Sequence, residues 1–359
     1  MNDFAHERNV SATVIGPRCL VTGAAGFLGK ALCRALVRRG CVVHAHDVRG
    51  SFDEHERIIP WKGDVRDFES VRRAAAGCAT AFHTAAVMSL LGICNRATRR
   101  EVESVNIGGT ENVIRACEAE GVPRLVHTST DSVCYRPHPV VAGDETMPYA
   151  ERCLDIYAKT KIAAEKMVRE ADGRNGVRTV CLRPAGLWGD DDGCYMMTKL
   201  LIQLKTGRFV ATIGGRKALA DNTHIENLVQ AELLVAEKLA TEPSRVGGKA
   251  YFITDEEPMN LIEWFRPLIE GLGYRVPKRS IPAPIAYAAA YLMEWLHRFG
   301  GPRPFLTRLE VHNCTTSFTF RCDRARRDLG YQPTIGRDEG MARCVARYRD
   351  MFHAKGSSQ

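Results

Sequence analysis

Short apolar runs alternate with amphipathic segments along the first half of the chain. The runs expected to form strands cover residues 19–22, 42–45, 80–84, 124–128 and 178–182. The segments with apolar positions at helical spacing cover residues 27–39, 70–76, 102–119 and 155–170. Short buried strands separated by helices are typical of a parallel sheet that helices cover on both faces. The pattern therefore predicts an α/β fold with a doubly wound parallel sheet.

The pattern loosens after residue 184, where Pro and Gly become frequent and longer loops separate the helices. We expect this second half to form a smaller lobe that closes over a ligand and is interleaved with the last strands of the sheet. The expected parts are an N-terminal extension at 1–17, a cofactor domain at 18–185, a substrate-binding lobe at 186–352 and a mobile tail at 353–359.

Composition changes this picture little. The 359 residues are 45% hydrophobic and 26% charged, as in an ordinary soluble globular protein. The 13 cysteines are irregularly spaced and include no Cys-x-x-Cys pair, so we expect a reducing, cytoplasmic location and neither a disulfide framework nor a metal site. Residues 1–16 contain Asp3, Glu7 and Arg8 and no apolar run, so no secretory signal is expected. A stretch of about 18 uncharged apolar residues, as a membrane span would need, does not occur either.

The net charge of +8 is distributed in short clusters of arginine at residues 34–39, 96–100 and 324–327. We interpret these clusters as solvated helix faces, and weak attraction to an anionic cofactor or membrane surface is the alternative. Aromatic residues do not interleave with the clusters, so nucleic acid is not an expected partner.

A glycine-rich turn joins the first expected strand to the first expected helix. Glycine at these positions lets the backbone turn tightly and approach a pyrophosphate, which the free N–H groups of the helix N-terminus then face. Since both the strand and the helix are present, the turn predicts a Rossmann-type dinucleotide site. The candidate cofactor contacts in the turn are Gly23, Ala25, Gly26, Phe27, Leu28 and Gly29.

Asp47 follows the second expected strand, 18 residues after Gly29. A carboxylate at that place accepts hydrogen bonds from the ribose hydroxyls of NAD and repels the additional phosphate of NADP. Arg49 lies close by and could instead accept a 2′-phosphate. We expect NAD as the cofactor, with Asp47 and Arg49 both near the ribose.

Tyr157 and Lys161 lie four residues apart in the fourth expected helix, so their side chains share one face. A nearby ammonium favours the phenolate and brings a tyrosine closer to the strength of a general base. The strand that precedes them ends in a run of hydroxyl residues, any of which could orient a substrate oxygen. Local chemistry leaves the choice among Ser129, Thr130 and Ser132 open.

Together these residues resemble the extended short-chain dehydrogenase/reductase family, over most of the chain. The matching segments are 22–29, 63–67, 83–86, 106–110, 157–161 and 182–184. The resemblance implies that Thr130 is the catalytic hydroxyl and that Asn106 supports the active-site geometry. It also implies that Asp64 and Val65 contact the adenine. Ala85, Ala86 and the segment from Pro184 to Gly186 are implied to lie near the nicotinamide half.

Within that family, the chain is most similar to the 3β-hydroxysteroid dehydrogenase branch. The similar segments are 144–149, 183–189, 222–227, 248–255 and 326–331. The resemblance implies oxidation of a 3β-hydroxyl on a steroid or sterol, with NAD as the hydride acceptor, in a homodimer. Asp131 departs from the branch by placing a charge beside Thr130, which leaves an isomerase step open. Candidate substrate contacts are Met88, Asp131, Leu187 and His224.

Residues 281–296 form an apolar segment that is too short to cross a bilayer and contains Glu294. We interpret it as a core-packing helix. The alternative is an apolar wall of a sterol pocket or a surface that touches a membrane. Met88, Leu90 and Leu91 could line the same pocket.

Other functions remain open from sequence. Related enzymes include reductases of long-chain 2-alkyl-3-oxo acids and, more distantly, nucleotide-sugar epimerases and dehydratases. A further alternative is a non-catalytic module that binds NAD as a sensor, although such relatives usually lose the tyrosine or the lysine.

Overall fold

The computed structural model describes residues 12–190 and 193–353, and the expected N-terminal extension and tail lie largely outside these ranges. Its centre is a seven-stranded sheet in the order β11-β7-β5-β4-β1-β2-β3, with every neighbouring pair parallel. The strands are β1 (Arg18–Thr22), β2 (Val42–Asp47), β3 (Ile58–Lys62), β4 (Thr80–His83), β5 (Arg124–Thr128), β7 (Arg178–Pro184) and β11 (Ala250–Ile253). The order reverses between β1 and β4, which is where such sheets bind ligands.

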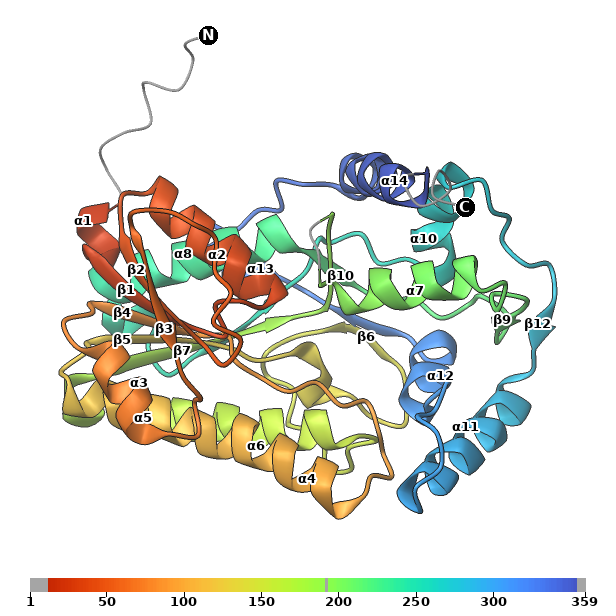
Figure 1. The fold of residues 1–359 in the computed structure, drawn as a ribbon, viewed down its shortest axis with the longest axis horizontal. Helices are drawn as coiled ribbons and strands as arrows, with labels where there is room; N and C mark the ends of the chain where they lie inside the picture. The colour runs from red at the N-terminus through yellow and green to blue at the C-terminus, as the bar shows by residue number, and fades with distance from the viewer. Residues whose placement is uncertain (1–11, 191–192, 354–359) are drawn as a thin grey trace, which may run out of the picture.

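Helices cover both faces of the sheet (Figure 1). On one face lie α1 (Ala12–Ile15), α2 (Phe27–Arg38), α8 (Ile225–Thr241) and α13 (Asp323–Leu329). On the other lie α3 (Phe68–Ala75), α5 (Gly109–Ala119) and α6 (Ile156–Glu170). Each layer has its own buried apolar cluster against the sheet. The expected Rossmann-type α/β fold is confirmed.

Two segments differ from expectation. Strand β3 was not expected, because it pairs only with β2 at the edge of the sheet and most of its side chains are exposed, so it has no buried apolar run. The expected helix at 102–119 begins earlier, as α4 (Arg96–Glu103), where Asn95 caps it by accepting a hydrogen bond from the Thr98 N–H at 2.9 Å. It then passes through a π-helical turn, η1 (Ser104–Gly108), before continuing as α5. A π-helical turn within a helix is often found at a functional site.

The second half of the chain builds a smaller lobe at the carboxyl ends of the strands. Its helices are α7 (Tyr195–Lys205), α10 (Leu261–Gly271), α11 (Ala283–Arg298), α12 (Arg308–Thr315) and α14 (Arg337–His353). The short helix α9 (Pro243–Val246) instead packs on α8 in the sheet layer. Three two-stranded pairs join the helices of the lobe: β8 (Gly186–Trp188) with β10 (Asn222–His224), β9 (Thr212–Ile213) with β12 (Ser280–Ile281), and β6 (Val140–Gly143) with β13 (Phe318–Phe320). A third apolar cluster, around Trp188 and Trp264, holds α7, α10 and α14 together. Strand β11 and helix α8 come from this half of the chain and join the central sheet layer.

The interpretation of residues 281–296 as a core-packing helix is wrong for most of its side chains. The helix exists, as α11, but only Ala286, Ala290 and Glu294 are buried in it. No helix in the described ranges is both long enough and apolar enough to cross a membrane.

Candidate active site

The glycine turn lies where β1 meets α2. Gly23 has a φ of +73°, and a Cβ there would lie 2.7 Å from the Ala85 nitrogen at the end of β4. A Cβ on Gly29 would lie 2.1 Å from the Gly23 carbonyl oxygen, and one on Gly26 would lie 3.0 Å from it. Only glycine allows the backbone to pack this closely.

The N-terminus of α2 is open to an anionic group. Its N-cap is Gly26, which provides no side-chain hydrogen bond to the first backbone N–H groups. The helix has 12 residues, with Leu28 buried on the side that faces the sheet. An uncapped helix N-terminus beside a close-packed glycine turn suits the pyrophosphate of a dinucleotide.

Asp47 ends β2 beside this turn. Its carboxylate accepts hydrogen bonds from the Ala25 N–H at 3.1 Å and from the Arg49 backbone N–H at 2.9 Å. The Arg49 guanidinium donates to both carboxylate oxygens at 3.2 Å. Burial raises the pKa of Asp47, but the bonds from Arg49 and Ala25 outweigh burial and keep the pKa below its usual value. The structure therefore holds an ionised carboxylate against the turn, with Arg49 on its outer side.

The residues implied to contact the adenine follow β3. Asp64 pairs with Arg66, whose guanidinium nitrogen lies 2.5 Å from the carboxylate. Val65 is buried under Gly109, where a Cβ would lie 2.6 Å from the valine Cγ2. Asn112 fixes the same segment by donating to the Val65 carbonyl at 2.9 Å.

The residues implied to lie near the nicotinamide come from the ends of β4 and β7. Ala85 is half-buried against Gly23, and Ala86 is exposed. Pro184 is the buried last residue of β7, and Gly186 begins β8, where it pairs with Asn222. Because the strands are parallel, these residues and the glycine turn lie along the same edge of the sheet.

Tyr157 and Lys161 lie in the first turns of α6, whose N-cap Asp155 accepts a hydrogen bond from the Ala158 N–H at 2.8 Å. Burial, with the nearby carboxylates of Asp155 and Asp131, raises the pKa of Tyr157. Burial lowers the pKa of Lys161 to about 8. The Lys161 ammonium donates to the Thr128 carbonyl at 2.5 Å and lies 3.3 Å from His127 Nε2.

The hydroxyl residues after β5 differ in their surroundings. Ser129 is buried and donates to Glu165 Oε2 at 2.5 Å, so its hydroxyl is engaged inside the protein. Thr130 is half-buried and caps the short helix η2 (Asp131–Cys134). Its Oγ1 lies 3.1 Å from Ser132 Oγ. Of the three hydroxyls that the sequence left open, Thr130 and Ser132 thus lie outside the buried layer.

Asp131 is a buried residue whose carboxylate accepts a hydrogen bond from Thr130. The Thr130 hydroxyl donates to Asp131 Oδ1 at 3.2 Å, and the Tyr135 hydroxyl donates to Oδ2 at 3.0 Å. Asp131 is 4% exposed, and burial raises its pKa to about 7 despite these hydrogen bonds. The structure thus places this carboxylate behind the hydroxyl of Thr130.

Asn106 lies in the π-helical turn and joins two segments of the site. Its side chain accepts from the Val87 N–H at 2.8 Å and donates to the Val87 carbonyl at 3.0 Å. It also donates to Thr160 Oγ1 at 3.0 Å, and Thr160 in turn donates to the Tyr157 carbonyl at 2.9 Å. Asn106 therefore holds the loop after β4 against the helix that carries Tyr157.

The residues expected to contact the substrate lie in different surroundings. Met88 is 43% exposed in the loop after β4, and Leu187 is half-buried in β8. His224 is fully buried, where it caps α8 and meets Trp188 edge to face at 4.7 Å. Burial lowers the pKa of His224 to about 4. Its ring packs against Trp188 in the interior, and its expected substrate contact stays a prediction.

Several buried polar residues around Lys161 were not singled out from sequence. The Thr128 hydroxyl donates to Glu232 Oε1, on α8, at 2.6 Å. Arg183 and Glu165 form an ion pair at 2.7 Å, with side chains 3% and 0% exposed. The Arg183-Pro184 segment drew attention to Arg183 in the sequence. The partner of Arg183 in the ion pair, Glu165, lies 18 residues earlier on another element, so the pair itself could not be predicted.

All 13 cysteines are free. Within residues 12–190 and 193–353, no group of three or more His, Cys, Asp or Glu side chains is arranged to hold a metal ion.

Known proteins resemble this chain in both sequence and fold. Residues 20–283 match the 3-beta hydroxysteroid dehydrogenase/isomerase family. A 3-beta-hydroxysteroid dehydrogenase of Mycolicibacterium neoaurum is 36% identical over 93% of this chain and 92% of its own. A 3 beta-hydroxysteroid dehydrogenase/Delta 5→4-isomerase of Mycobacterium tuberculosis strain CDC 1551 is 37% identical over 93% of this chain and 91% of its own. A short-chain dehydrogenase/reductase superfamily protein of Agrobacterium tumefaciens, solved with bound NAD, superposes with a TM-score of 0.72 at 20% identity, over 95% of this chain and 99% of its own.

Proposed function

The chain belongs to the 3-beta hydroxysteroid dehydrogenase/isomerase family, and from this premise we propose that it oxidises the 3β-hydroxyl of a steroid or sterol to the 3-ketone with NAD. One observation carries the proposal. Tyr157 and Lys161 lie on one helix at the sheet edge that also carries the glycine turn and Thr130. A proton acceptor, a cation and an orienting hydroxyl are the groups that oxidation of an alcohol requires of the protein.

The residues at the sheet edge suit NAD. Gly23, Gly26 and Gly29 leave room for a pyrophosphate, and the uncapped α2 provides N–H groups for it. The ionised Asp47 at the end of β2 favours ribose hydroxyls over a 2′-phosphate. When bound, NAD supplies the acceptor for the hydride that leaves the substrate carbon.

Tyr157 accepts the hydroxyl proton in this proposal. Its surroundings oppose ionisation, because burial and two carboxylates raise its pKa. The Lys161 ammonium on the same helix face offsets part of that cost by stabilising the phenolate. With a pKa of about 8, Lys161 lies close to the point where it can also pass a proton onwards.

Thr130 orients the substrate oxygen towards Tyr157. The Thr130 hydroxyl, which here donates to Asp131 Oδ1 at 3.2 Å, would turn to donate to the substrate oxygen, so the single proton of the substrate hydroxyl is left for Tyr157. Asn106 acts through other residues, because it fixes the loop after β4 to the helix of Tyr157. Met88 and Leu187 are the apolar residues that we propose to contact the steroid.

The proposal is tested with a panel of 3β-hydroxysteroids and sterols, with and without a 4α-carboxylate, by following NADH absorbance. Long-chain β-hydroxy acids and nucleotide sugars belong in the same panel, since they represent the alternative substrate classes. Turnover confined to either of those classes would overturn the steroid assignment.

Tyr157→Phe separates catalysis from binding. It should lower turnover by about 10²–10⁴-fold, because the proton acceptor is lost, and leave NAD affinity nearly unchanged. Tyr251→Phe is the matched control, since it removes a tyrosine hydroxyl on the buried strand β11 that donates to Asp328 of α13. Retention of turnover in Tyr157→Phe would contradict the assigned role.

A further inference from the structure

Lys161 extends from α6 to the end of β5, where its side chain is buried. The ammonium donates to the Thr128 carbonyl at 2.5 Å and lies 3.3 Å from His127 Nε2. An ammonium has three N–H donors and no acceptor, so His127 Nε2 receives one of its protons. Since these two groups are the hydrogen-bond partners of Lys161 among the described residues, one N–H remains for groups at the edge of the sheet.

This contact determines where the His127 ring carries its proton. Because Nε2 accepts from the ammonium, it has no proton of its own, and the neutral ring keeps its proton on Nδ1. A charged ring would have an N–H at both nitrogens and would direct one of them at the Lys161 ammonium. Burial, with the charge of Lys161, lowers the pKa of His127 well below its usual value. His127 is therefore a neutral acceptor.

The second ring nitrogen of His127 explains why the residue type matters. His127 is fully buried in the central sheet, between His83 on β4 and Cys181 on β7. Its Nδ1 has no hydrogen-bond partner in the part of the chain that the structure describes. A buried N–H without a partner costs free energy, which an apolar ring of similar shape would avoid. The contact with Lys161 is what accounts for a histidine at this position.

His83, whose ring centroid lies 5.2 Å from that of His127, is a buried histidine of a different kind. The Thr110 hydroxyl donates to the Asn106 carbonyl at 2.7 Å, so it accepts from His83 Nε2 at 2.9 Å. His83 Nδ1 then accepts from the Thr22 hydroxyl at 2.7 Å. Burial lowers the pKa of His83 to about 3, so its ring is neutral too. Both of its nitrogens are engaged by hydroxyls, and only His127 bonds to the cation.

The carboxylates that face Lys161 are bonded to other groups. Glu165 on α6 forms its ion pair with Arg183 at 2.7 Å. Glu232 on α8 accepts from the Thr128 hydroxyl at 2.6 Å. Among the described residues, neither carboxylate forms a hydrogen bond with Lys161. The two direct acceptors of the ammonium are therefore neutral groups of consecutive residues at the end of β5.

We propose that His127 is a positioning residue for Lys161, whose ammonium it holds through Nε2 so that the remaining N–H is available to the cofactor ribose and Tyr157. Strand β5 is paired with β4 and β7 on its two sides, so this acceptor is in place before a cofactor binds. Without it the ammonium is less stable, and the Tyr157 phenolate loses part of the positive charge that favours it. The proposal deepens the proposed function and rests on it for the role of Lys161 beside Tyr157.

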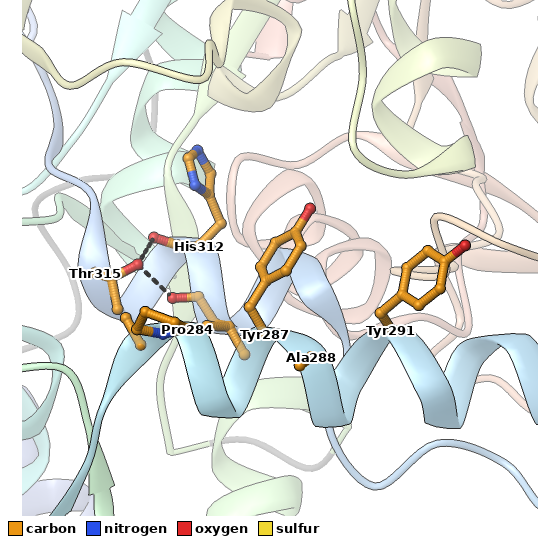
Figure 2. Close-up of a pocket in the computed structure, with 8 residues that line it drawn as sticks. Pro284, Tyr287, Ala288, Tyr291, His312 and Thr315 are labelled. Atoms are coloured by element: carbon orange, nitrogen blue, oxygen red, sulfur yellow. Dashed lines mark hydrogen bonds between the residues drawn. The ribbon is translucent and has the colours of Figure 1, made fainter.

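Nitrogen NMR of the protein labelled at its histidines tests the contact without any turnover. At pH 7 we expect His127 to be neutral, with its proton on Nδ1. Two histidines provide references of opposite kind, because a carbonyl only accepts. His44 Nδ1 donates to the Ala74 carbonyl at 2.6 Å, and His312 Nε2 donates to the Arg136 carbonyl at 3.1 Å. Figure 2 shows His312 on α12, beside the groove that this helix forms with α11.

Two substitutions of His127 separate hydrogen bonding from packing. His127→Phe keeps a flat ring without an acceptor, and His127→Gln places an amide oxygen the same number of bonds from the backbone as Nε2. In His127→Phe the acid limb of kcat/KM against pH should move up by about one pH unit, because a charged group loses one hydrogen bond. Below that limb, kcat/KM should fall about tenfold. His127→Gln should keep the limb close to its wild-type position.

His44→Phe is the matched control, because it also removes a buried histidine from the central sheet, at a ring that bonds to Ala74 and not to Lys161. It should keep the wild-type pH profile. The assay uses whichever alcohol of the panel is turned over, so the test does not depend on the substrate being a steroid.

The proposal is wrong if wild-type His127 carries its proton on Nε2. It is equally wrong if the acid limb of His127→Phe stays at its wild-type position, or if His127→Gln or His44→Phe moves the limb as far as His127→Phe does. Should His127→Phe not fold, the NMR result on the wild type still decides. Failure of every alcohol in the panel would contradict the proposed function and leave the NMR test of the contact intact.

Discussion

Beneath the candidate active site the protein buries charged side chains, whereas on α11 it exposes apolar ones. Lys161, Glu165, Arg183 and Glu232 are each at most 3% exposed. On and just after α11, five apolar residues are each at least 46% exposed: Ile285, Leu292, Trp295, Leu296 and Phe299. Both regions depart from the usual distribution of side chains, but in opposite directions.

The two departures have different consequences for folding. A buried charge costs several kcal/mol unless its partners are in place, so each charged residue under the site depends on the others. An exposed apolar side chain makes few contacts in the folded protein, so folding depends little on it. The comparison predicts that substitutions in the first region change the free energy of unfolding and that those in the second leave it nearly unchanged.

The largest effect on stability is expected at the ion pair of Arg183 and Glu165. Arg183→Met leaves the Glu165 carboxylate buried with only the hydroxyls of Ser129 and Tyr149 as partners. We expect the free energy of unfolding to fall by about 3–5 kcal/mol, as measured by urea denaturation. Adding Glu165→Gln should restore most of the loss, because a neutral amide leaves no buried charge and can accept from one hydroxyl and donate to the other. If the double variant is as unstable as the single one, the loss is due to packing and not to the uncompensated charge.

A smaller, pH-dependent effect is expected at Glu232. Burial raises the pKa of this residue to about 7, against a hydrogen bond from Thr128 and the charge of Lys161. Between the unfolded pKa near 4.5 and the folded value near 7, the folded state retains a proton that the unfolded state releases. The contribution of Glu232 to stability therefore falls as pH rises through this window and is constant above it.

Glu232→Gln removes that titration and keeps an acceptor for Thr128. At pH 8 the variant should be more stable than the wild type by about 1–3 kcal/mol, and the difference should vanish near pH 4. Unfolding curves measured from pH 4 to pH 8 check this. Glu151→Gln, at an exposed position, should keep the wild-type slope. A difference that is constant across the range would show that Glu232 is not the titrating group.

The smallest effect on stability is expected on α11. Leu292→Ser/Trp295→Ser should change the free energy of unfolding by no more than about 0.5 kcal/mol. Leu268→Ser, on the buried side of α10, should by comparison cost at least about 2 kcal/mol. Thermal unfolding of both proteins makes the comparison. A loss on α11 as large as that of Leu268→Ser would show that Leu292 and Trp295 are packed within the protein.

Local patterns were sufficient for much of the fold. The alternation of apolar runs and helical segments predicted β1, β2, β4, β5 and β7 and the helices between them, because the period of buried positions follows directly from backbone geometry. The glycine turn could be recognised because its close contacts require glycine in a short run of sequence. Strand β3 could not, because an edge strand needs no buried face and so has no apolar pattern.

The candidate site also has some features that local sequence predicted and others that it could not predict. The spacing of Tyr157 and Lys161 placed both on one face of α6, and a helix alone is enough to do so. Other features of the site depend on contacts between elements distant in sequence. They are the inward orientation of Ser129, the hydrogen bond between Thr128 and Glu232 across 104 residues, and the hydrogen bonds of Asn106 with Val87. The exposure of α11 depends on such contacts too, since its composition suits a core as well as a surface.

The sequence by itself determined the elements and the residue types of the site, because both follow from neighbours along the chain. Only the tertiary structure decided which polar groups are buried together and which apolar face is left uncovered, because burial depends on what packs against each residue.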